Sequence, residues 1–373
     1  MGYIVREVRG GADFRKFYQF QNKLYKDCPV YVPSLDYDQR RTLRKAPPLD
    51  YCKQKLFLAW DENGRAVGRI NAIINPRYNE MYHTRRMRFG WFDFEEDIEI
   101  ARLLLEAAVK WGISEGMDTI HGPLGYNTMY KQGMVVEGFD SIPPVNCLYN
   151  YPYYPEYMER LGFAKECDWL QYKLEGSQAL PEKLERISRL LLKKYNLRIV
   201  DVRQLKRDND IVSDFFYNFN RSFLSVHNFV PLTDKEIKEE GRQYIGQMQS
   251  DLTCFVMDEE DKIASFGICT PFMSKAFQKA GGKLFPFGWW HILRARKKFD
   301  ALDLMMVGSD PKWRGKGLSA IFHTRLTRNF HKLGIKYAIT NPQLETNPAV
   351  KVWESYPERE LYIRRRCYIK KIR

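Results

Sequence analysis

The chain has 373 residues, more than one average domain needs and enough for two hydrophobic cores. Hydrophobic residues make up 44% and charged residues 28%, an ordinary balance for a soluble globular protein. The net charge of +14 favours an anionic partner, such as a membrane surface, a phosphorylated cofactor or a nucleic acid. No apolar run approaches the ~20 residues of a membrane span. The N-terminal residues have no apolar signal core, so we expect a cytoplasmic protein.

Seven cysteines and six histidines are scattered along the chain, with no CxxC pair and no regular spacing. An odd, dispersed set of cysteines is typical of reduced intracellular thiols. His323 and His331 fall in one predicted helix, but their spacing does not make a metal pair. The sequence therefore predicts no bound metal.

The first half of the chain shows two hydrophobic periodicities. Alternating runs around the polar turn 61–64 predict a β-hairpin, and apolar residues at i, i+3 and i+7 predict a helix at 98–114. In chain order we expect a strand, a helix, a hairpin, a strand, a helix, a strand, a short helix and a strand, at 3–8, 14–24, 57–60 with 66–70, 89–94, 98–114, 119–120, 155–163 and 169–174.

The second half repeats this order. Its elements are expected at 197–202, 208–224, 254–257 with 263–269, 302–307, 318–333, 335–340, 349–355 and 362–369. Units of well over a hundred residues that repeat once indicate a duplicated domain rather than a solenoid. We expect an N-terminal domain at 1–176, a linker helix at 177–196 and a C-terminal domain at 197–373.

A glycine-containing segment joins the strand 302–307 to the helix 318–333. Gly315 and Gly317 permit a tight turn that points backbone N–H groups outward at the first turn of the helix, which makes a site for an anion. Arg314 and Lys316 add positive charge. The spacing fits neither a Walker loop nor a dinucleotide fingerprint, since position 320 is alanine.

This segment resembles the motif [QR]-x-x-G-x-[GA] that follows the central strand of the GNAT acyltransferases, with Ser319 in place of Gly or Ala. The resemblance implies an α/β (α+β) fold of two tandem GNAT-like domains, each a mixed, mostly antiparallel sheet flanked by helices. It also implies acyl-CoA or acetyl-CoA as co-substrate and no metal. The implied cofactor-binding residues are Met306, Val307, Gly308, Trp313, Arg314, Gly315, Lys316, Gly317, Leu318 and Ser319.

The corresponding junction of the first half, 92–97, is acidic and contains no glycine. Carboxylates cap a helix well, but they repel a pyrophosphate. We therefore expect the first half to bind no CoA and to form one wall of the substrate pocket.

The resemblance also implies a mechanism. The thioester lies along the central strand, where backbone groups of 305–308 hold the pantetheine and polarise the carbonyl. A base takes the proton of the amine, and an acid protonates the leaving thiolate. Many relatives carry a glutamate base at a position that falls at Ala301 here. Asp300 and Asp303 beside it are either displaced substitutes or surface charges, and we favour surface charges.

Three further residues are catalytic candidates from the resemblance. Glu345 and Asn347 stand where the family often places an acid–Asn pair. A helix that begins there, with Asn347 as its cap and Pro348 at its first position, explains the same residues. Tyr356 is the candidate acid for the thiolate, at a longer spacing than usual.

The irregular segment 121–154 is rich in Gly, Pro, Asn and Tyr, which is unusual for an idle surface loop. It either lines the acceptor pocket or packs the domain interface. Its candidate substrate-binding residues are Asn127, Asp140, Tyr149 and Asn150.

An insert at 281–298 places aromatic residues before a basic cluster, as membrane-surface elements do. It is alternatively a cover for an acyl chain or an aromatic loop packed on its own domain. With it the chain resembles double-GNAT proteins that include the bacterial ceramide synthase-like N-acyltransferases. The run Arg364–Arg366 is predicted to be a solvated strand face rather than a binding patch.

These observations predict an enzyme of bacterial lipid metabolism, an acyl-CoA-dependent N-acyltransferase that acylates an amine such as a sphingoid base. The alternatives are an acetyltransferase of a small amine or protein lysine, and a non-catalytic basic protein on an anionic membrane. Peripheral contact with the inner membrane face fits either class. No nucleic-acid-binding motif is present, so we expect no nucleic acid partner. The oligomeric state stays open.

Overall fold

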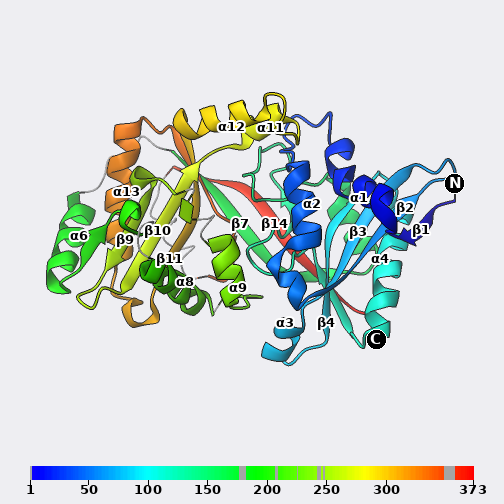
Figure 1. Cartoon of the computed structure of the whole chain (residues 1–373), viewed down its shortest axis with the longest axis horizontal. Helices are drawn as coiled ribbons and strands as arrows, with labels where there is room; N and C mark the ends of the chain where they lie inside the picture. Colours follow the sequence, from blue (N-terminus) through cyan, green and yellow to red (C-terminus); the bar gives the residue numbers. More distant parts are fainter. Residues whose placement is uncertain are drawn as a thin grey trace.

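A computed structural model describes residues 2–175, 182–205, 209–224, 226–241, 245–246, 248–347 and 358–373. Their strands form one mixed sheet that runs through the whole molecule, with helices on its faces (Figure 1). The strand order is β1-β2-β3-β4-β5-β14-β7-β12-β11-β10-β9-β8. Five strands at one end mirror five at the other, as a duplicated unit predicts. Among the described residues, no helix has the length and apolar character to cross a bilayer.

The N-terminal half, up to residue 175, contains most of the elements expected from its sequence. The helix predicted at 98–114 has those bounds, and Asp97 caps it by accepting from the N–H of Glu99. The elements are β1 (Ile4–Glu7), α1 (Gly10–Leu24), α2 (Asp36–Lys45), β2 (Lys53–Trp60), β3 (Ala66–Ile74), α3 (Pro76–Met81), β4 (Arg86–Phe94), α4 (Ile98–Ser114), β5 (Thr119–Gly122), β6 (Met134–Glu137), α5 (Tyr153–Arg160) and β7 (Ala164–Glu175).

The C-terminal half begins with α6. Gly334, in the left-handed conformation, ends the helix that follows the glycine turn. The elements are α6 (Glu182–Lys194), β8 (Arg198–Val200), α7 (Val202–Leu205), α8 (Asn209–Phe223), α9 (Asp234–Glu236), β9 (Thr253–Met257), β10 (Ile263–Pro271), α11 (Ser274–Ala280), α12 (Gly288–Lys297), β11 (Ala301–Ser309), α13 (Ser319–Leu333), β12 (Tyr337–Thr340), β13 (Gln343–Leu344) and β14 (Arg359–Lys371). The helix predicted at 349–355 lies outside the described residues.

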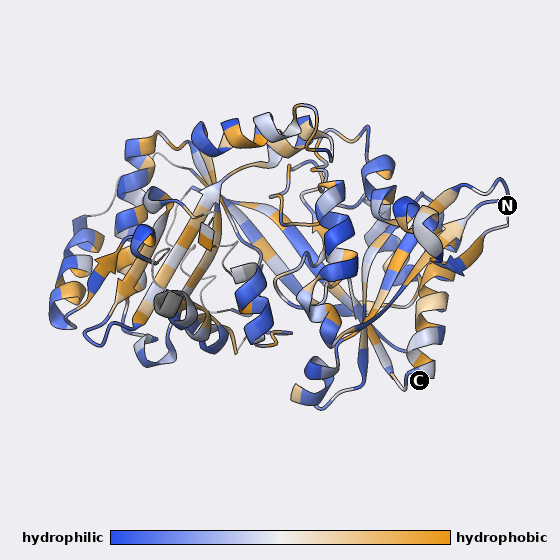
Figure 2. Ribbon diagram, viewed as in Figure 1, coloured by the Kyte–Doolittle hydropathy of each residue, from blue (hydrophilic) through white to orange (hydrophobic). Residues whose placement is uncertain are grey.

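Glycines mark where a helix packs closely on the sheet in each half. A Cβ on Gly68 of β3 would lie 2.8 Å from side-chain atoms of Ile100 and Leu104 on α4. A Cβ on Gly267 of β10 would lie 3.1 Å from the Phe322 ring on α13. The next residue along β3, Arg69, donates to the backbone of α1 on the opposite face. Each half is therefore a sheet covered on both faces, and its apolar residues concentrate on the strands (Figure 2).

The two halves exchange strands at their junction. β14 lies between β5 and β7 of the N-terminal half, where Tyr368 pairs with Gly122 and Cys367 pairs with Cys167. β7 in turn pairs with β12 of the C-terminal half. Each core thus depends on a strand that the other half supplies. The sheet contains strands from both halves and so does not itself divide the chain. The predicted domain boundaries at 176 and 196 therefore stay predictions.

The prediction of a solvated Arg364–Arg366 face was wrong. Arg365 is fully buried, and it donates to Gln171 Oε1 at 2.9 Å and to the Leu148 carbonyl at 2.6 Å. Arg366 donates to Asp168 Oδ1 at 2.8 Å. The reason is the strand exchange: β14 is a central strand, so its cations must be paired within the protein.

Replacing Tyr368 with alanine tests the exchange. Tyr368 is fully buried in the core of the N-terminal half although it lies at the C-terminal end of the chain. The substitution should lower the free energy of unfolding by about 3–5 kcal/mol. Limited proteolysis with mass spectrometry should locate the new cleavage sites within residues 1–175. Lys371→Ala, at an exposed position of the same strand, is the control, and cleavage confined to the C-terminal half would contradict this account.

Candidate functional site

The segment between β11 and α13 is a turn built on two left-handed glycines. Gly315 has φ +74° and Gly317 has φ +77°. A Cβ on Gly315 would meet nothing within 4 Å, and one on Gly317 would lie 3.8 Å from Leu191. The need for glycine is therefore conformational rather than steric.

This turn leaves backbone donors free at the start of α13. The N–H groups of Ala320 and Ile321 bond to the carbonyls of Gly317 and Leu318, each at 3.0 Å. For the N–H groups of Gly315, Gly317 and Leu318, the described part of the chain offers no acceptor, and no side chain caps the helix. Free N–H groups at the positive end of a fifteen-residue helix form a site for an anion.

Cations surround the turn, and a buried aromatic residue supports it. Lys316 Nζ lies 4.3 Å from the centre of the Trp313 ring. Trp313 is buried and packs edge-on against Tyr195 at 5.5 Å. Arg314 donates to the Ser222 carbonyl at 2.5 Å, which holds its guanidinium at the rim. Trp313 thus packs the turn against the protein interior, while Arg314 and Lys316 supply positive charge beside it.

The matching junction of the N-terminal half is filled by its own carboxylates. Asp97 accepts from the Glu99 N–H at 2.8 Å and from the Tyr3 hydroxyl at 2.9 Å. Glu95 pairs with Arg65. A second anion there would meet negative charge instead of free donors, so only the C-terminal turn has an anion-binding arrangement.

Strand β11 opens beside this turn. Its register with β10 shifts so that Met305 has no partner, and its pairing with β12 ends at Leu304 and Thr340. The side chains of Met305 and Met306 are half-buried and Val307 is exposed, although the strand is central. One edge of the backbone from 305 onward is therefore not paired with β12.

The opening of β11 faces a cavity between the two halves, which we call the junction cavity. Its volume is about 400 Å³. The C-terminal half contributes the open strand and the residues after β12, and the N-terminal half contributes α2 and the loop between β5 and β7. Its lining includes Met305, Met306, Asn341, Pro342, Asp38, Thr42, Met129, Tyr130, Asn146 and Cys147.

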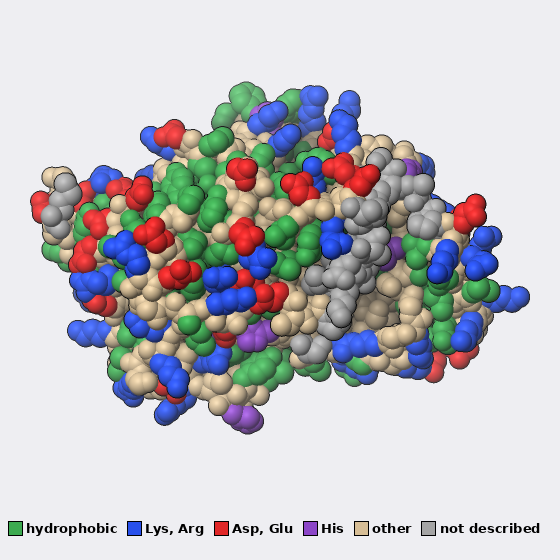
Figure 3. Space-filling model, turned by 180° about the vertical axis from the view of Figure 1, so that it is seen from behind, with side chains coloured by type: hydrophobic (Ala, Val, Ile, Leu, Met, Phe, Trp, Pro, Cys, Tyr) green, Lys and Arg blue, Asp and Glu red, His purple; other side chains and the backbone are tan. Residues whose placement is uncertain are grey.

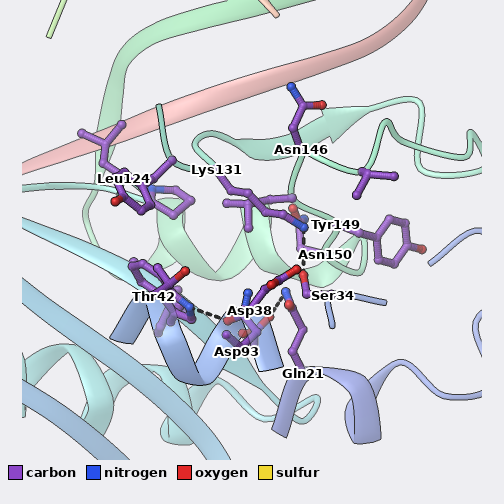
Figure 4. A pocket seen from close by; sticks show the side chains of 18 of the residues that line it. Gln21, Ser34, Asp38, Thr42, Asp93, Leu124, Lys131, Asn146, Tyr149 and Asn150 are labelled. Atoms are coloured by element: carbon purple, nitrogen blue, oxygen red, sulfur yellow. Dashed lines mark hydrogen bonds between the residues drawn. The ribbon is translucent and has the colours of Figure 1, made fainter. Parts of the chain in front are cut away.

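A second cavity of about 340 Å³, the inner cavity, is lined by residues of the N-terminal half together with Phe277 (Figure 4). It shares part of its wall with the junction cavity, so the two adjoin. The shared residues are Asp38, Thr42, Met129, Tyr130 and Asn146. Most of its remaining wall is apolar or aromatic, namely Leu35, Trp91, Phe92, Leu124, Met134, Val145, Leu148, Tyr149, Tyr154 and Phe277.

One region of the inner cavity is strongly polar. Lys131 Nζ donates to Ser34 Oγ at 3.0 Å, and burial lowers the pKa of Lys131 to about 8 (Figure 4). Burial also raises the pKa of Asp38. Asp93 is fixed by Arg69 Nε at 2.8 Å and by Gln21 Nε2 at 3.1 Å. Apolar walls with one polar end suit an amphipathic ligand.

The predicted substrate-binding residues separate into two groups. Tyr149 and Asn150 line the inner cavity, where the Asn150 amide also pairs with the backbone of Val135. Asn127 donates to Glu236 Oε1 at 2.7 Å instead, and it lines neither cavity. Asp140 is exposed and lies away from both. The roles of all four stay predictions.

The predicted catalytic residues lie elsewhere. Glu345 pairs with Lys165 Nζ at 2.7 Å and lines neither cavity. Asn347 lies near the end of a described segment, and its N–H donates to the Leu344 carbonyl. Tyr356 and Pro348 lie outside the described residues. The roles assigned to Glu345, Asn347 and Tyr356 also stay predictions.

Asp303 is a candidate that sequence reasoning undervalued. Asp300 is a surface charge, as favoured, and pairs with Lys336 at 2.9 Å. Asp303 is only 6% exposed, its Oδ1 has no hydrogen-bond partner among the described residues, and burial raises its pKa well above the usual range. The prediction of a surface charge was wrong for Asp303. Its place in a central strand covered on both faces was the available signal.

Gly317→Glu tests the anion site. A residue with a side chain costs about 1–2 kcal/mol in this left-handed backbone conformation. The glutamate carboxylate would also lie next to the free N–H groups and compete with a bound anion. Binding of CoA should weaken by about 100-fold or more in calorimetric titration. Gly334→Glu is the matched control, because Gly334 has φ +66° at the other end of the same helix. Equal CoA affinity in the two variants would contradict the assignment.

The comparisons with known proteins bear on the fold of the chain. No family model matches the sequence. Protein YghO of Escherichia coli is 26% identical over 377 residues, which cover 99% of this chain and 95% of that protein. The bacterial ceramide synthase of Caulobacter vibrioides is 26% identical over 293 residues, covering 78% and 75% of the two chains. A tandem GNAT protein from the clavulanic acid biosynthesis pathway superposes with a TM-score of 0.57 at 11% identity, over 100% of this chain and 99% of that one. The chain therefore has the tandem GNAT fold that its sequence motif predicted.

Proposed function

We propose that this protein is an acyl-CoA-dependent N-acyltransferase that binds its acyl donor in the C-terminal half and its amine acceptor at the junction of the two halves. The observation that carries the proposal is that the glycine turn, the open strand β11 and the junction cavity lie next to one another. A turn with free N–H groups follows the open strand β11, and that strand lines the junction cavity. The GNAT fold supports this reaction class.

The turn suits the pyrophosphate of CoA. The N–H groups of Gly315, Gly317 and Leu318 supply donors, and Arg314 and Lys316 supply charge. The unpaired edge of β11 offers backbone groups to an extended pantetheine arm. In this arrangement the thioester would lie beside Met305 and Met306, which line the junction cavity.

The reaction follows from this placement. The neutral amine nitrogen attacks the thioester carbonyl carbon and forms the C–N bond. The C–S bond breaks, the sulfur leaves as a thiolate, and the proton lost by the amine must reach a base. Backbone N–H groups of β11 would stabilise the oxyanion that forms in between.

Asp303 is our proposed proton acceptor. It lies on β11 two residues before Met305, and its charge affects Cys147, which lines the junction cavity. A raised pKa makes a carboxylate a stronger base than an exposed aspartate. Holding an unpaired carboxyl in a buried site is costly, which favours a functional reason for Asp303 over a structural one.

We further propose a long-chain amine as the acceptor. The inner cavity joins the junction cavity and combines apolar walls with a polar end around Lys131, Asp38 and Ser34. A chain of methylenes ending in amine and hydroxyl groups matches that arrangement. The similarity to the bacterial ceramide synthase over most of both chains supports the same class of substrate.

The hairpin of α11 and α12 is our proposed membrane contact. Phe285, Phe287, Trp289, Trp290 and Leu293 are between 44% and 78% exposed, and basic residues at 294 and 296–298 follow them. Hydrophobic and basic side chains lie together along the top of Figure 3, where this hairpin lies. Aromatic residues beside cations are suited to an anionic lipid surface.

The hairpin also touches the inner cavity. Phe277 of α11 lines that cavity, and Ser274 Oγ donates to the Pro143 carbonyl at 2.7 Å. Gln278 Nε2 donates to the Tyr31 carbonyl at 3.0 Å. Helix α11 therefore lies between the exposed aromatic residues of the hairpin and the inner cavity, so a lipid bound at those residues would enter the cavity beside α11.

Asp303→Asn tests the proposed base. The substitution keeps size and removes basicity, so kcat should fall by about 10²-fold while KM for acyl-CoA stays nearly constant. The wild-type rate should fall as pH drops through the raised pKa of Asp303, because protonation abolishes the base, and the variant should lack this limb. Steady-state rates with palmitoyl-CoA and sphinganine measure both.

Asp300→Asn, at the exposed residue just before the same strand, is the matched control and should retain the wild-type kcat. A variant at position 303 with unchanged kcat and an unchanged pH profile would contradict the role of Asp303. Turnover of acetyl-CoA with small amines only, in the same assay, would instead favour a small-molecule acetyltransferase.

Replacing both Trp289 and Trp290 with alanine tests the membrane contact. The double variant should bind vesicles containing anionic phospholipid about 10-fold or more weakly in cosedimentation, because each indole contributes apolar area to the interface. Leu190→Ala, at another exposed apolar position on α6, should bind as the wild type does. Equal sedimentation of all three proteins would refute the assignment.

A further inference from the structure

Five side chains with metal-binding atoms meet where the two halves exchange strands. His121 comes from β5, Glu166 and Cys167 come from β7, Cys367 comes from β14, and His227 comes from the segment after α8. The strands that carry the first four are neighbours in the sheet, and Cys367 pairs directly with Cys167. None of the five lines the junction cavity or the inner cavity.

The distances among these atoms are short. Glu166 Oε2 lies 3.0 Å from His121 Nδ1 and 3.1 Å from Cys367 Sγ. The ligand atoms of His121, Glu166 and Cys367 all lie within 4.8 Å of one another. Bond lengths of about 2.0–2.3 Å place the ligand atoms of a tetrahedral zinc site roughly 3.3–3.8 Å apart. The two Glu166 contacts would therefore lengthen by a few tenths of an ångström around an ion, and the widest separation, up to 4.8 Å, would shorten by about 1 Å.

Two further residues lie beside this group of three. The Cys167 thiol interacts with both the Cys367 thiol and the His227 ring. His227 Nε2 also lies 3.3 Å from Glu166 Oε1. Arg86 Nη1 donates to the same Oε1 at 2.7 Å, which leaves Oε2 facing His121 and Cys367. An outer partner that fixes the orientation of a ligating carboxylate is usual at metal sites.

We propose that this cluster is a zinc site, with His121 Nδ1, Glu166 Oε2 and Cys367 Sγ as ligands and His227 beside it. Cys167 Sγ, which lies outside that group of three but interacts with Cys367, would move inward as the fourth ligand. Imidazole and thiolate donors together favour zinc over magnesium or calcium, which prefer oxygen ligands only. His121 and Cys367 are fully buried, and a divalent cation would compensate the charge of Glu166 and of the thiolates. The inference is independent of the proposed acyltransferase function.

The place of the site indicates a structural role. Its ligands connect β5 and β7 of the N-terminal half to β14 of the C-terminal half. The segment that carries His227 is also tied to α3 by a hydrogen bond from the Tyr82 hydroxyl to the Phe229 carbonyl at 2.8 Å. A bound ion would stabilise the pairing of β14 with β5 and β7, and so the contact between the two halves.

Metal analysis of the purified full-length chain tests the proposal. Protein made in zinc-supplemented medium and purified without a metal-affinity tag should contain about one zinc per chain. Replacement by Co²⁺ should give the d–d bands of tetrahedral cobalt together with a thiolate-to-cobalt charge-transfer band. A strong chelator should lower the Tm by roughly 5–10 °C.

Cysteine variants decide which residues bind the ion. Cys367→Ser and Cys167→Ser should each lose the charge-transfer intensity and most of the chelator effect on Tm. Cys254→Ser, at a buried cysteine of β9, should retain both. Near-ultraviolet circular dichroism checks that each variant is folded.

Three results would overturn the zinc site. One is wild-type protein that is folded, contains less than about a tenth of an equivalent of metal and shows no cobalt bands. Another is a cobalt spectrum that Cys367→Ser and Cys167→Ser leave unchanged. The third is a persistent disulfide between Cys167 and Cys367 in metal-free protein, detected by mass spectrometry. None of these results depends on acyl transfer, so they leave the proposed function to its own tests.

Discussion

The antiparallel pairing of β7 with β14 is the interaction on which the rest of the structure depends. Each strand closes the sheet of the half to which it does not belong by sequence, so neither core is complete alone. This pairing buries Arg365 and brings Asp168 to Arg366. It also joins the strands of the two halves into one sheet, at whose junction the two cavities adjoin.

The two halves differ at the same structural position, the junction between a central strand and the helix that follows it. In the C-terminal half, two left-handed glycines leave donors free at the start of α13. In the N-terminal half, the Asp97 carboxylate accepts from the Glu99 N–H at the start of α4. A carboxylate that already accepts from a helix end competes with a pyrophosphate for the same donors, so the free donors of α13 are what support our proposal of an acyl-donor site in the C-terminal half.

Much of the fold could be predicted because its elements carry local signals. The amphipathic spacing at 98–114 and the turn at 61–64 depend only on neighbouring residues, as does the glycine turn before α13. The strand exchange could not be predicted, since β14 pairs with residues about 200 positions away and an alternating strand looks the same in either sheet. The exposure of Arg365 was mispredicted because the strand exchange that buries it could not be foreseen.

In the candidate site, too, features with a local sequence signal could be predicted and features that depend on tertiary contacts could not. The loop 314–319 was found from its motif, because a phosphate-type turn must be continuous in sequence. Asp303 was misjudged because its burial depends on helices that cover both faces of β11. The cluster of His121, Glu166 and Cys367 has no spacing motif, since its ligands come from three strands that meet only in the folded sheet.

Hydrogen–deuterium exchange with and without palmitoyl-CoA tests the central claim most directly, because it reports where the acyl donor binds on the intact chain. The account predicts slower exchange at 305–308 and 314–320 and no change at 95–99. It is contradicted if the acyl donor leaves 314–320 unprotected, or if protection appears at the acidic junction of the N-terminal half instead.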